Sequence, residues 1–331
     1  MDNNQITHEG AANNFYSQIQ YSLENYKKHN LKLNDFSNVV ICGLGGSGIG
    51  GKLAKTYFTD ISSIPIEVVS GYSLPAYVNE RSLVIVSSYS GDTEETISLI
   101  EQISPLNATC LAMSTGGKIE SISKDMDYYF LSIKKGYQPR MALGFSLSYL
   151  FLILSELFNL NLENELQGTV NNLKDNSSNY ESKGKEILDY FENQLQNKFI
   201  FISGESLSSV SLRACQQMEE NAKHEAFYHT LPECNHNVTE SYYGKLPSNF
   251  VFLEGWNHDR TNHRITFLRD LIKKYGNKVY SLSLTEKSVT GIFEMILTLD
   301  WLSIHLSNSK KVNNMEVPNI MDLKNFLSNI K

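Results

Sequence analysis

Two loops rich in serine and glycine carry the side chains of this sequence that are best suited to binding an anion. The first reads GLGGSGIGG over residues 43–51, and the second reads SSYSGDTEET over residues 87–96. Each follows a short apolar run, VVIC at 39–42 and LVIV at 83–86. A strand that turns through small residues into a helix leaves backbone N–H groups unpaired at the positive end of the helix dipole. Such a turn attracts a phosphate group.

Hydroxyl groups in both loops add hydrogen-bond donors without adding charge. They belong to Ser47, Ser88, Ser90 and Thr93. If both turns lie at the same edge of one parallel sheet, they can hold a phosphate from two sides. The sequence therefore predicts a binding site for a small phosphorylated molecule.

A dinucleotide site is the first alternative, because Gly43-x-Gly45-x-x-Gly48 fits the fingerprint of such sites. That fingerprint also needs an acidic residue at the end of the second strand, where it holds the ribose. Here Glu67 lies inside the second apolar run and Ser70 follows it, so the ribose ligand is missing. The GxxxxGK[ST] pattern of a P-loop is absent as well. A phosphosugar site is favoured over both.

The composition of the whole chain narrows the class further. The chain has 331 residues, 41% of them hydrophobic, and a formal net charge of −7, which argues against a nucleic-acid-binding surface. Four cysteines lie far apart with no CxxC pair, as in reduced cytoplasmic proteins. The N-terminus has no signal-peptide pattern, and the longest apolar run, Met141 to Leu154, is too short to span a bilayer. We expect a cytoplasmic protein that binds neither nucleic acid nor membrane.

Apolar runs and amphipathic stretches alternate through the first half of the chain. The expected strands are 39–42, 66–69, 83–86, 109–113 and 128–133, and the expected helices are 11–30, 48–59, 93–103 and 141–158. This alternation predicts an α/β fold with a doubly wound parallel sheet flanked by helices.

A polar stretch and a second copy of the same plan follow. The expected strands are 199–202, 250–253 and 279–282, and the expected helices are 207–227, 263–275, 289–306 and 320–330. We therefore expect an N-terminal module over 1–160, a linker over 161–185 and a C-terminal module over 186–331. The serine loop of the second module, 203–209, has a single glycine, so the phosphate site is assigned to the first module.

The order of the motifs resembles a known family. GLGGSGIGG and SYSGDTEET are similar to the phosphate loops of the sugar isomerase (SIS) domain. The segments QPRMALG (138–144), MEENAKHEAFYHTLPECNHN (218–237) and IMDLKNFL (320–327) resemble those of the bifunctional phosphoglucose/phosphomannose isomerases. The resemblance covers nearly the whole chain and implies two tandem SIS-type modules.

The resemblance implies a set of substrate-binding residues and a set of catalytic residues. The phosphate-binding positions are Gly46, Ser47, Ser88, Ser90 and Thr93, and the catalytic positions are Glu220, His236, Arg140 and Lys324. Aldose–ketose isomerisation needs one base that moves a proton between C2 and C1, and a partly desolvated carboxylate suits this task. The family pattern puts this base at Glu220, although Glu219 beside it is equally suited by residue type.

The other three catalytic positions follow from the same resemblance. It assigns ring opening to His236, because a histidine can both give and take a proton near neutral pH. It assigns stabilisation of the enediolate to Arg140, whose fixed positive charge opposes the developing negative charge. Lys324 matches a further proton-transfer residue. Relatives take the histidine from a neighbouring subunit, which implies a homodimer with a shared active site.

A metal site is a second alternative, because His224, His229, Cys234 and His236 lie within one short segment. Their spacing fits no common zinc pattern, so we expect no metal and no cofactor.

The predicted function is interconversion of glucose 6-phosphate and fructose 6-phosphate by a metal-free enediol mechanism, with mannose 6-phosphate accepted where the site admits the other C2 epimer. The sequence leaves the preference between the two aldoses open. A non-catalytic phosphosugar sensor and an amino-sugar phosphate isomerase remain alternatives.

Overall fold

The computed structural model describes residues 6–284 and 286–330. By its internal contacts the chain divides into two compact units. Unit 1 contains Asn13–Ser177 and Ser288–Phe293, and unit 2 contains Thr7–Ala12, Ser178–Lys287 and Glu294–Lys331.

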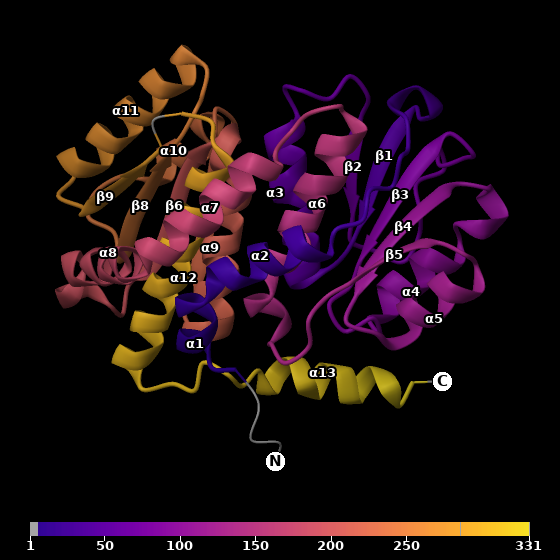
Figure 1. The fold of residues 1–331 in the computed structure, drawn as a ribbon. Helices are drawn as coiled ribbons and strands as arrows, with labels where there is room; N and C mark the ends of the chain where they lie inside the picture. The colour runs from indigo at the N-terminus through magenta and orange to yellow at the C-terminus, as the bar shows by residue number, and fades with distance from the viewer. Residues whose placement is uncertain (1–5, 285, 331) are drawn as a thin grey trace. The chain divides into compact units, whose positions relative to one another are not determined.

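Unit 1 is built on a five-stranded parallel sheet in the order β2-β1-β3-β4-β5 (Figure 1). Its strands are β1 (Asn38–Cys42), β2 (Ile66–Val69), β3 (Ser82–Ser87), β4 (Thr109–Ser114) and β5 (Tyr129–Ser132). Strand β1 pairs with β2 on one side and with β3 on the other. Every residue of β1 and β3 is buried, as expected for central strands that helices cover on both faces.

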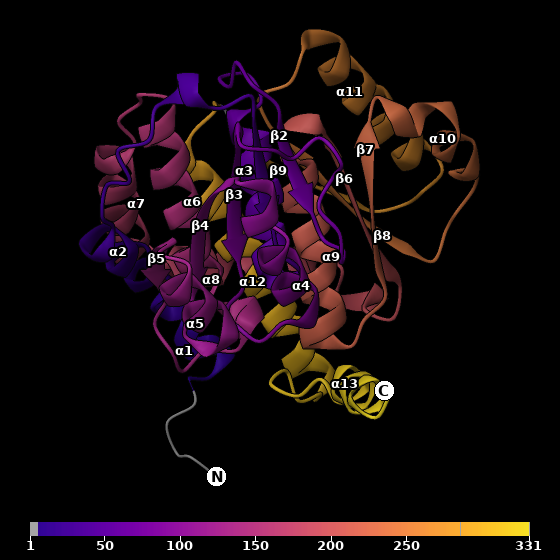
Figure 2. The same cartoon turned by 90° about the vertical axis from the view of Figure 1, so that its right-hand side faces the viewer.

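Helices cover both faces of this sheet. They are α2 (Phe15–Asn25), α3 (Gly45–Phe58), α4 (Glu94–Glu101), α5 (Gly117–Asp125), α6 (Leu143–Leu157) and α7 (Glu163–Asp175). Figure 1 shows α3 and α6 on one face of the sheet and α4 and α5 on the other, and Figure 2 presents α4 and α5 toward the viewer. This arrangement confirms the predicted doubly wound fold.

Unit 2 repeats the plan with four parallel strands in the order β7-β6-β8-β9. The strands are β6 (Lys198–Gly204), β7 (Ala226–Leu231), β8 (Ser248–Glu254) and β9 (Val279–Ser283). The helices of this half are α1 (His8–Asn13), α8 (Ser177–Tyr190), α9 (Ser208–Ala222), α10 (Val238–Ser241), α11 (Asp259–Lys274), α12 (Val289–Lys310) and α13 (Pro318–Ser328). The first residues of α12 belong to unit 1.

Two expectations from the sequence differ from the structure. Residues 161–185, expected to be a linker, form α7 and most of α8, because Leu166, Val170 and Leu173 make a buried stripe at helical spacing. The helix expected over 207–227 ends at Ala222, where Lys223 adopts a left-handed conformation with φ 48°.

The strand β7 therefore starts inside a segment that the sequence assigned to a helix. Its residues, AFYHTL, are rich in aromatic and β-branched side chains, and they pair in parallel with β6. Because β7 lies at the edge of the sheet, its Phe227 and Tyr228 side chains are exposed.

Among the described residues, α12 is long and apolar enough to cross a membrane. Of its apolar stretch, 78% is buried inside the protein, as in the core helix of a globular fold.

Candidate active site

The two serine-glycine loops meet at one edge of the sheet in unit 1. They follow the carboxyl ends of β1 and β3, and Cys42 and Val86 are paired in register at those ends. The strand order reverses here, since β1 connects onward to β2 on its other side. Open α/β sheets bind ligands in the crevice at such a switch point.

The start of α3 is free to bind an anion. Leu44 precedes the helix, gives no side-chain cap, and is followed by a first turn without acidic residues. The N-terminal amides and the positive end of the dipole are therefore not neutralised by the helix itself. Helix α4 differs, because Glu94 and Glu95 occupy its first turn. The arrangement favours α3 as the helix that faces a phosphate.

Ser47 joins the two loops. Its Oγ accepts a hydrogen bond from the backbone N–H of Tyr89 at 3.2 Å, and the residue is buried. The Tyr89 hydroxyl in turn accepts from the N–H of Tyr137 at 2.9 Å and lies 3.1 Å from the carbonyl oxygen of Lys134, to which it donates. The second loop is thus tied both to the first loop and to the segment that leads to Arg140.

The remaining hydroxyls are held by bonds within the second loop. Ser88 Oγ accepts from the N–H of Gly91 and donates to Thr93 Oγ1, both at 3.2 Å. Ser90 Oγ accepts from the N–H of Asp92 at 3.2 Å.

These bonds leave three hydroxyl protons available. Ser47, Ser90 and Thr93 each accept a hydrogen bond, and among the described residues none of their O–H groups has an acceptor. A hydroxyl that is fixed by an accepted bond keeps its proton for a ligand. Three hydroxyl donors in the two loops are thus available to an anion, and we call Gly46, Ser47, Ser88, Ser90 and Thr93 the cradle.

Arg140 lies directly beside this cradle. A Cβ on Gly46 would stand 2.8 Å from the carbonyl oxygen of Pro139 and 3.4 Å from Cα of Arg140, so only glycine allows this approach. Arg140 is 4% exposed. The structure therefore brings together, within unit 1, all five predicted phosphate-binding residues and the predicted arginine.

The acidic residue of the second strand, Glu67, is engaged away from the position of a ribose ligand. Glu67 lies in β2 and forms an exposed ion pair with Lys55 at 2.9 Å. Ser70, after the strand, donates to the carbonyl oxygen of Gly43 at 2.8 Å. The edge has no carboxylate in the ribose position among the described residues, which agrees with the rejection of a dinucleotide site.

The predicted base lies near the end of α9 in unit 2. Glu220 is half-buried, whereas Glu219 is exposed. Although the Glu219 side chain is exposed, neighbouring protein atoms partly desolvate its carboxyl, and this desolvation and then the charge of Glu220 raise its pKa. The helix stops just beyond, and Lys223 Nζ donates to the carbonyl oxygen of Glu220 at 2.6 Å. Both glutamates remain compatible with the role of base.

The other two predicted catalytic residues also belong to unit 2. His236 ends a short 3₁₀ turn, Glu233–His236, and is exposed. Lys324 lies on α13, where every side chain is exposed. Both side chains are accessible, as proton donors to a bound substrate must be.

The histidine-rich segment is not arranged as a metal site. His224 Nε2 contacts the carbonyl oxygen of Asn197 at 2.8 Å, and His229 lies on β7. Within the described part of the chain, no group of three or more His, Cys, Asp or Glu residues is placed to hold a metal ion.

Sequence reasoning missed two residues that shape the cradle. Tyr89 joins the loops through the bonds described above, and Gly91, with φ +78°, allows the turn: a Cβ there would stand 1.8 Å from the carbonyl oxygen of Gly116. Both stand in the quoted SSYSGDTEET motif, where the central glycine was the available signal.

Comparison with known proteins identifies the domains of the chain. Residues 32–141 match the SIS domain, and residues 190–327 match the bacterial phospho-glucose isomerase C-terminal SIS domain. A hypothetical protein from Thermus thermophilus has the same fold, with a TM-score of 0.75, 14% identity, and coverage of 99% of this chain and 90% of that one. The fold and the loops thus define a protein built from two SIS domains.

Two curated relatives narrow the class. The chain is 33% identical to the bifunctional phosphoglucose/phosphomannose isomerase of Caldicellulosiruptor bescii, over 96% of this chain and 98% of that one. It is 29% identical to the enzyme of the same name from Aquifex aeolicus, over 95% and 96% of the two chains. The chain belongs to the bifunctional phosphoglucose/phosphomannose isomerase family.

Proposed function

We propose that this protein is an isomerase that interconverts glucose 6-phosphate or mannose 6-phosphate with fructose 6-phosphate. The observation that carries this proposal is the cradle in unit 1. Its fixed hydroxyls and the start of α3 suit a terminal phosphate, and the buried Arg140 beside them suits an oxyanion on the attached sugar.

The chemistry is a proton transfer along the open-chain sugar. His236 gives a proton to the ring oxygen while the anomeric hydroxyl loses one, which opens the ring. The base removes the C2 proton to give a cis-enediolate, and the guanidinium of Arg140 stabilises its negative oxygen. The same base returns the proton to C1 while a proton moves from the C2 oxygen to the C1 oxygen, and the ketose results. The C2 centre is planar in the enediolate, so both aldose epimers yield the same product.

Lys324 completes the proposed set as a further proton-transfer group, and no cofactor takes part. We also propose a cytoplasmic homodimer in which His236 serves the active site of the neighbouring copy. The exposed position of His236 and the four free, buried cysteines support these two points.

Substitution of the two adjacent glutamates tests the chemistry. We expect Glu220→Gln to lower kcat by about three orders of magnitude or more, since the amide cannot accept the C2 proton, while fructose 6-phosphate still binds. Glu219→Gln is the matched control, on the same turn of α9, and is expected to keep kcat within about tenfold. Wild-type turnover in Glu220→Gln would remove Glu220 as the base.

The substrate is tested by a coupled assay with glucose, mannose and fructose 6-phosphates, run with and without a chelator. We expect turnover of the aldose phosphates that a chelator does not abolish. Turnover only with ammonia and fructose 6-phosphate would indicate an amino-sugar phosphate isomerase. Binding of all three sugars without turnover would indicate a sensor.

A further inference from the structure

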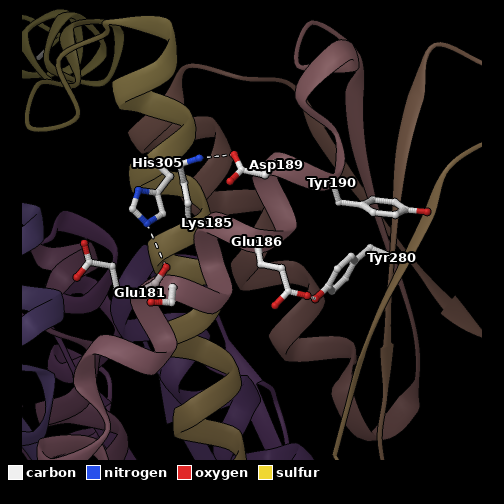
Figure 3. Close-up of a pocket in the computed structure, with 8 residues that line it drawn as sticks. Glu181, Lys185, Glu186, Asp189, Tyr190, Tyr280 and His305 are labelled. Carbon is white, nitrogen blue, oxygen red and sulfur yellow. Dashed lines mark hydrogen bonds and ion pairs between the residues drawn. The ribbon is translucent and has the colours of Figure 1, made fainter.

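Two pockets of unit 2 differ in how their charged groups are paired. The larger, of about 700 Å³, lies along α8, β9 and α12 (Figure 3). In it Lys185 forms an ion pair with Asp189, and the Tyr280 hydroxyl donates to Glu186 at 2.7 Å. Lys185, the lysine of this pocket, is thus neutralised by Asp189, so the pocket offers an anion no unpaired lysine.

The smaller pocket, of about 420 Å³, lies between α11 and the segment 233–241 that carries His236. Its lining residues are Asn235, Thr239, Arg260, His263, Arg264 and Phe267. None of these is acidic, and neither arginine has a carboxylate within ion-pair distance among the described residues. Two guanidinium groups that lack a carboxylate partner attract an anion, and their planar forks match a phosphate.

The position of Arg260 does not stabilise its own helix. It is the second residue of α11, where a cation opposes the helix dipole. Its backbone N–H is already capped by His258 Nδ1 at 3.1 Å. Asp259, the first residue of α11, offsets the positive end of the helix but does not line the pocket, so the two arginines are the charged groups that face a ligand there.

Arg264 connects the pocket to the segment of His236. Its Nη1 donates to Asn235 Oδ1 at 3.2 Å, and Asn235 Nδ2 donates to Thr239 Oγ1 at 3.1 Å. An anion that takes the Nη1 hydrogen bond of Arg264 displaces the side chain of Asn235, the residue next to His236. Phe267, at 63% exposure, gives the pocket an apolar wall for the carbon skeleton of a ligand.

We propose that this pocket is a second anion site, on unit 2, that binds a small phosphomonoester and weakens the bond between Arg264 and Asn235 when occupied. Binding itself does not depend on the proposed function. The effect on turnover, which passes through the segment of His236, rests on the proposed function.

The test uses the full chain with Phe267→Trp as a local fluorescence reporter and inorganic phosphate as the probe, with ionic strength held constant by chloride. We expect a saturable change in fluorescence. The further pair Arg260→Gln and Arg264→Gln is expected to weaken binding at least tenfold. The control pair Lys273→Gln and Lys274→Gln removes the same charge from the last turn of α11 and is expected to leave binding unchanged.

Calorimetric titration of the unsubstituted chain gives an independent reading, with two phosphate sites expected and one left after the arginine pair is replaced. If the enzyme turns over hexose phosphates, phosphate should inhibit it with a component that substrate does not relieve and that the arginine variant lacks. Absence of a saturable signal, equal loss in the lysine pair, or an unaltered dissociation constant in the arginine pair would overturn the second site. Failure of turnover alone leaves the binding result intact and counts against the proposed function.

Discussion

The two units have the same switch point in their sheets, but they present different surfaces there. In unit 1 the edge between β1 and β3 offers hydroxyl protons without acceptors among the described residues, and the start of a helix without a cap. In unit 2 the corresponding edge, between β6 and β8, is filled by the side chain of Asn257. A Cβ on Gly204 would stand 2.0 Å from Asn257 Oδ1.

The hydroxyls of unit 2 are also used internally. Ser206 Oγ donates to Asn257 Oδ1 at 2.8 Å, and Ser211 Oγ donates to Ser203 Oγ at 2.9 Å. The order of the strands therefore creates a crevice at the switch point of both sheets. The residues that follow each strand decide whether a ligand can bind in that crevice. Under the proposed function, unit 1 holds the phosphate and unit 2 carries the acid–base residues.

The largest effect on stability is expected from a side chain added at Gly91, in the turn of the second loop. Gly91→Ala should destabilise the protein by about 3 kcal/mol or more, because it strains a positive φ and places a methyl group against a backbone oxygen. Urea unfolding measures this loss. Gly71→Ala is the control, since open space surrounds that position, and a change above about 0.5 kcal/mol is not expected there. Equal stability of the two variants would contradict the geometry of the loop.

Removal of one hydroxyl from each switch point tests the comparison itself. Ser47→Ala should raise KM for fructose 6-phosphate about tenfold, the effect of one lost hydrogen bond to a charged group of about 1.4 kcal/mol. Ser206→Ala should leave KM unchanged, because its hydroxyl binds Asn257. Steady-state kinetics on both variants show which of the two switch points binds the phosphate. A larger increase in KM for Ser206→Ala would assign the phosphate to unit 2.

Removal of the Asn257 side chain from the switch point of unit 2 should lower the stability of the protein and leave substrate binding unchanged. Asn257→Ala removes the partner of Ser206 and is expected to lower the free energy of unfolding by about 1 kcal/mol. The measurement pairs chemical denaturation with KM for fructose 6-phosphate. An altered KM at unchanged stability would show that this edge takes part in substrate binding.

The smallest effect concerns the charged end of α9. Partial desolvation of the carboxyl and the neighbouring Glu220 raise the pKa of Glu219 in the folded state, so the folded protein holds this proton to higher pH than the unfolded chain does. That stabilisation is complete below the unfolded pKa of about 4.3 and is lost as pH rises through the folded pKa. Unfolding measured from about pH 4 to 7 should therefore show a decline in the wild type that Glu219→Gln lacks. Parallel curves of stability against pH for the two proteins would contradict a raised pKa of Glu219.

The sequence predicted the parts of the site that depend on local chain direction. The apolar runs before Gly43 and Ser87 had to be buried strands, and parallel strands bring the loops after them to one edge. It could not predict contacts between distant segments, such as the approach of Arg140 to Gly46 or the bonds of Tyr89. The strand β7 was missed because α9 ends at a lysine in a left-handed conformation, without the glycine that commonly marks a helix end.

A crystal structure with bound fructose 6-phosphate tests the central claim most directly. We predict that the phosphate lies at the start of α3, within hydrogen-bond distance of the Ser47 and Thr93 hydroxyls, with Arg140 beside the sugar. A phosphate bound instead between β6 and β8, against Ser206 or Asn257, would contradict the division of roles between the two units.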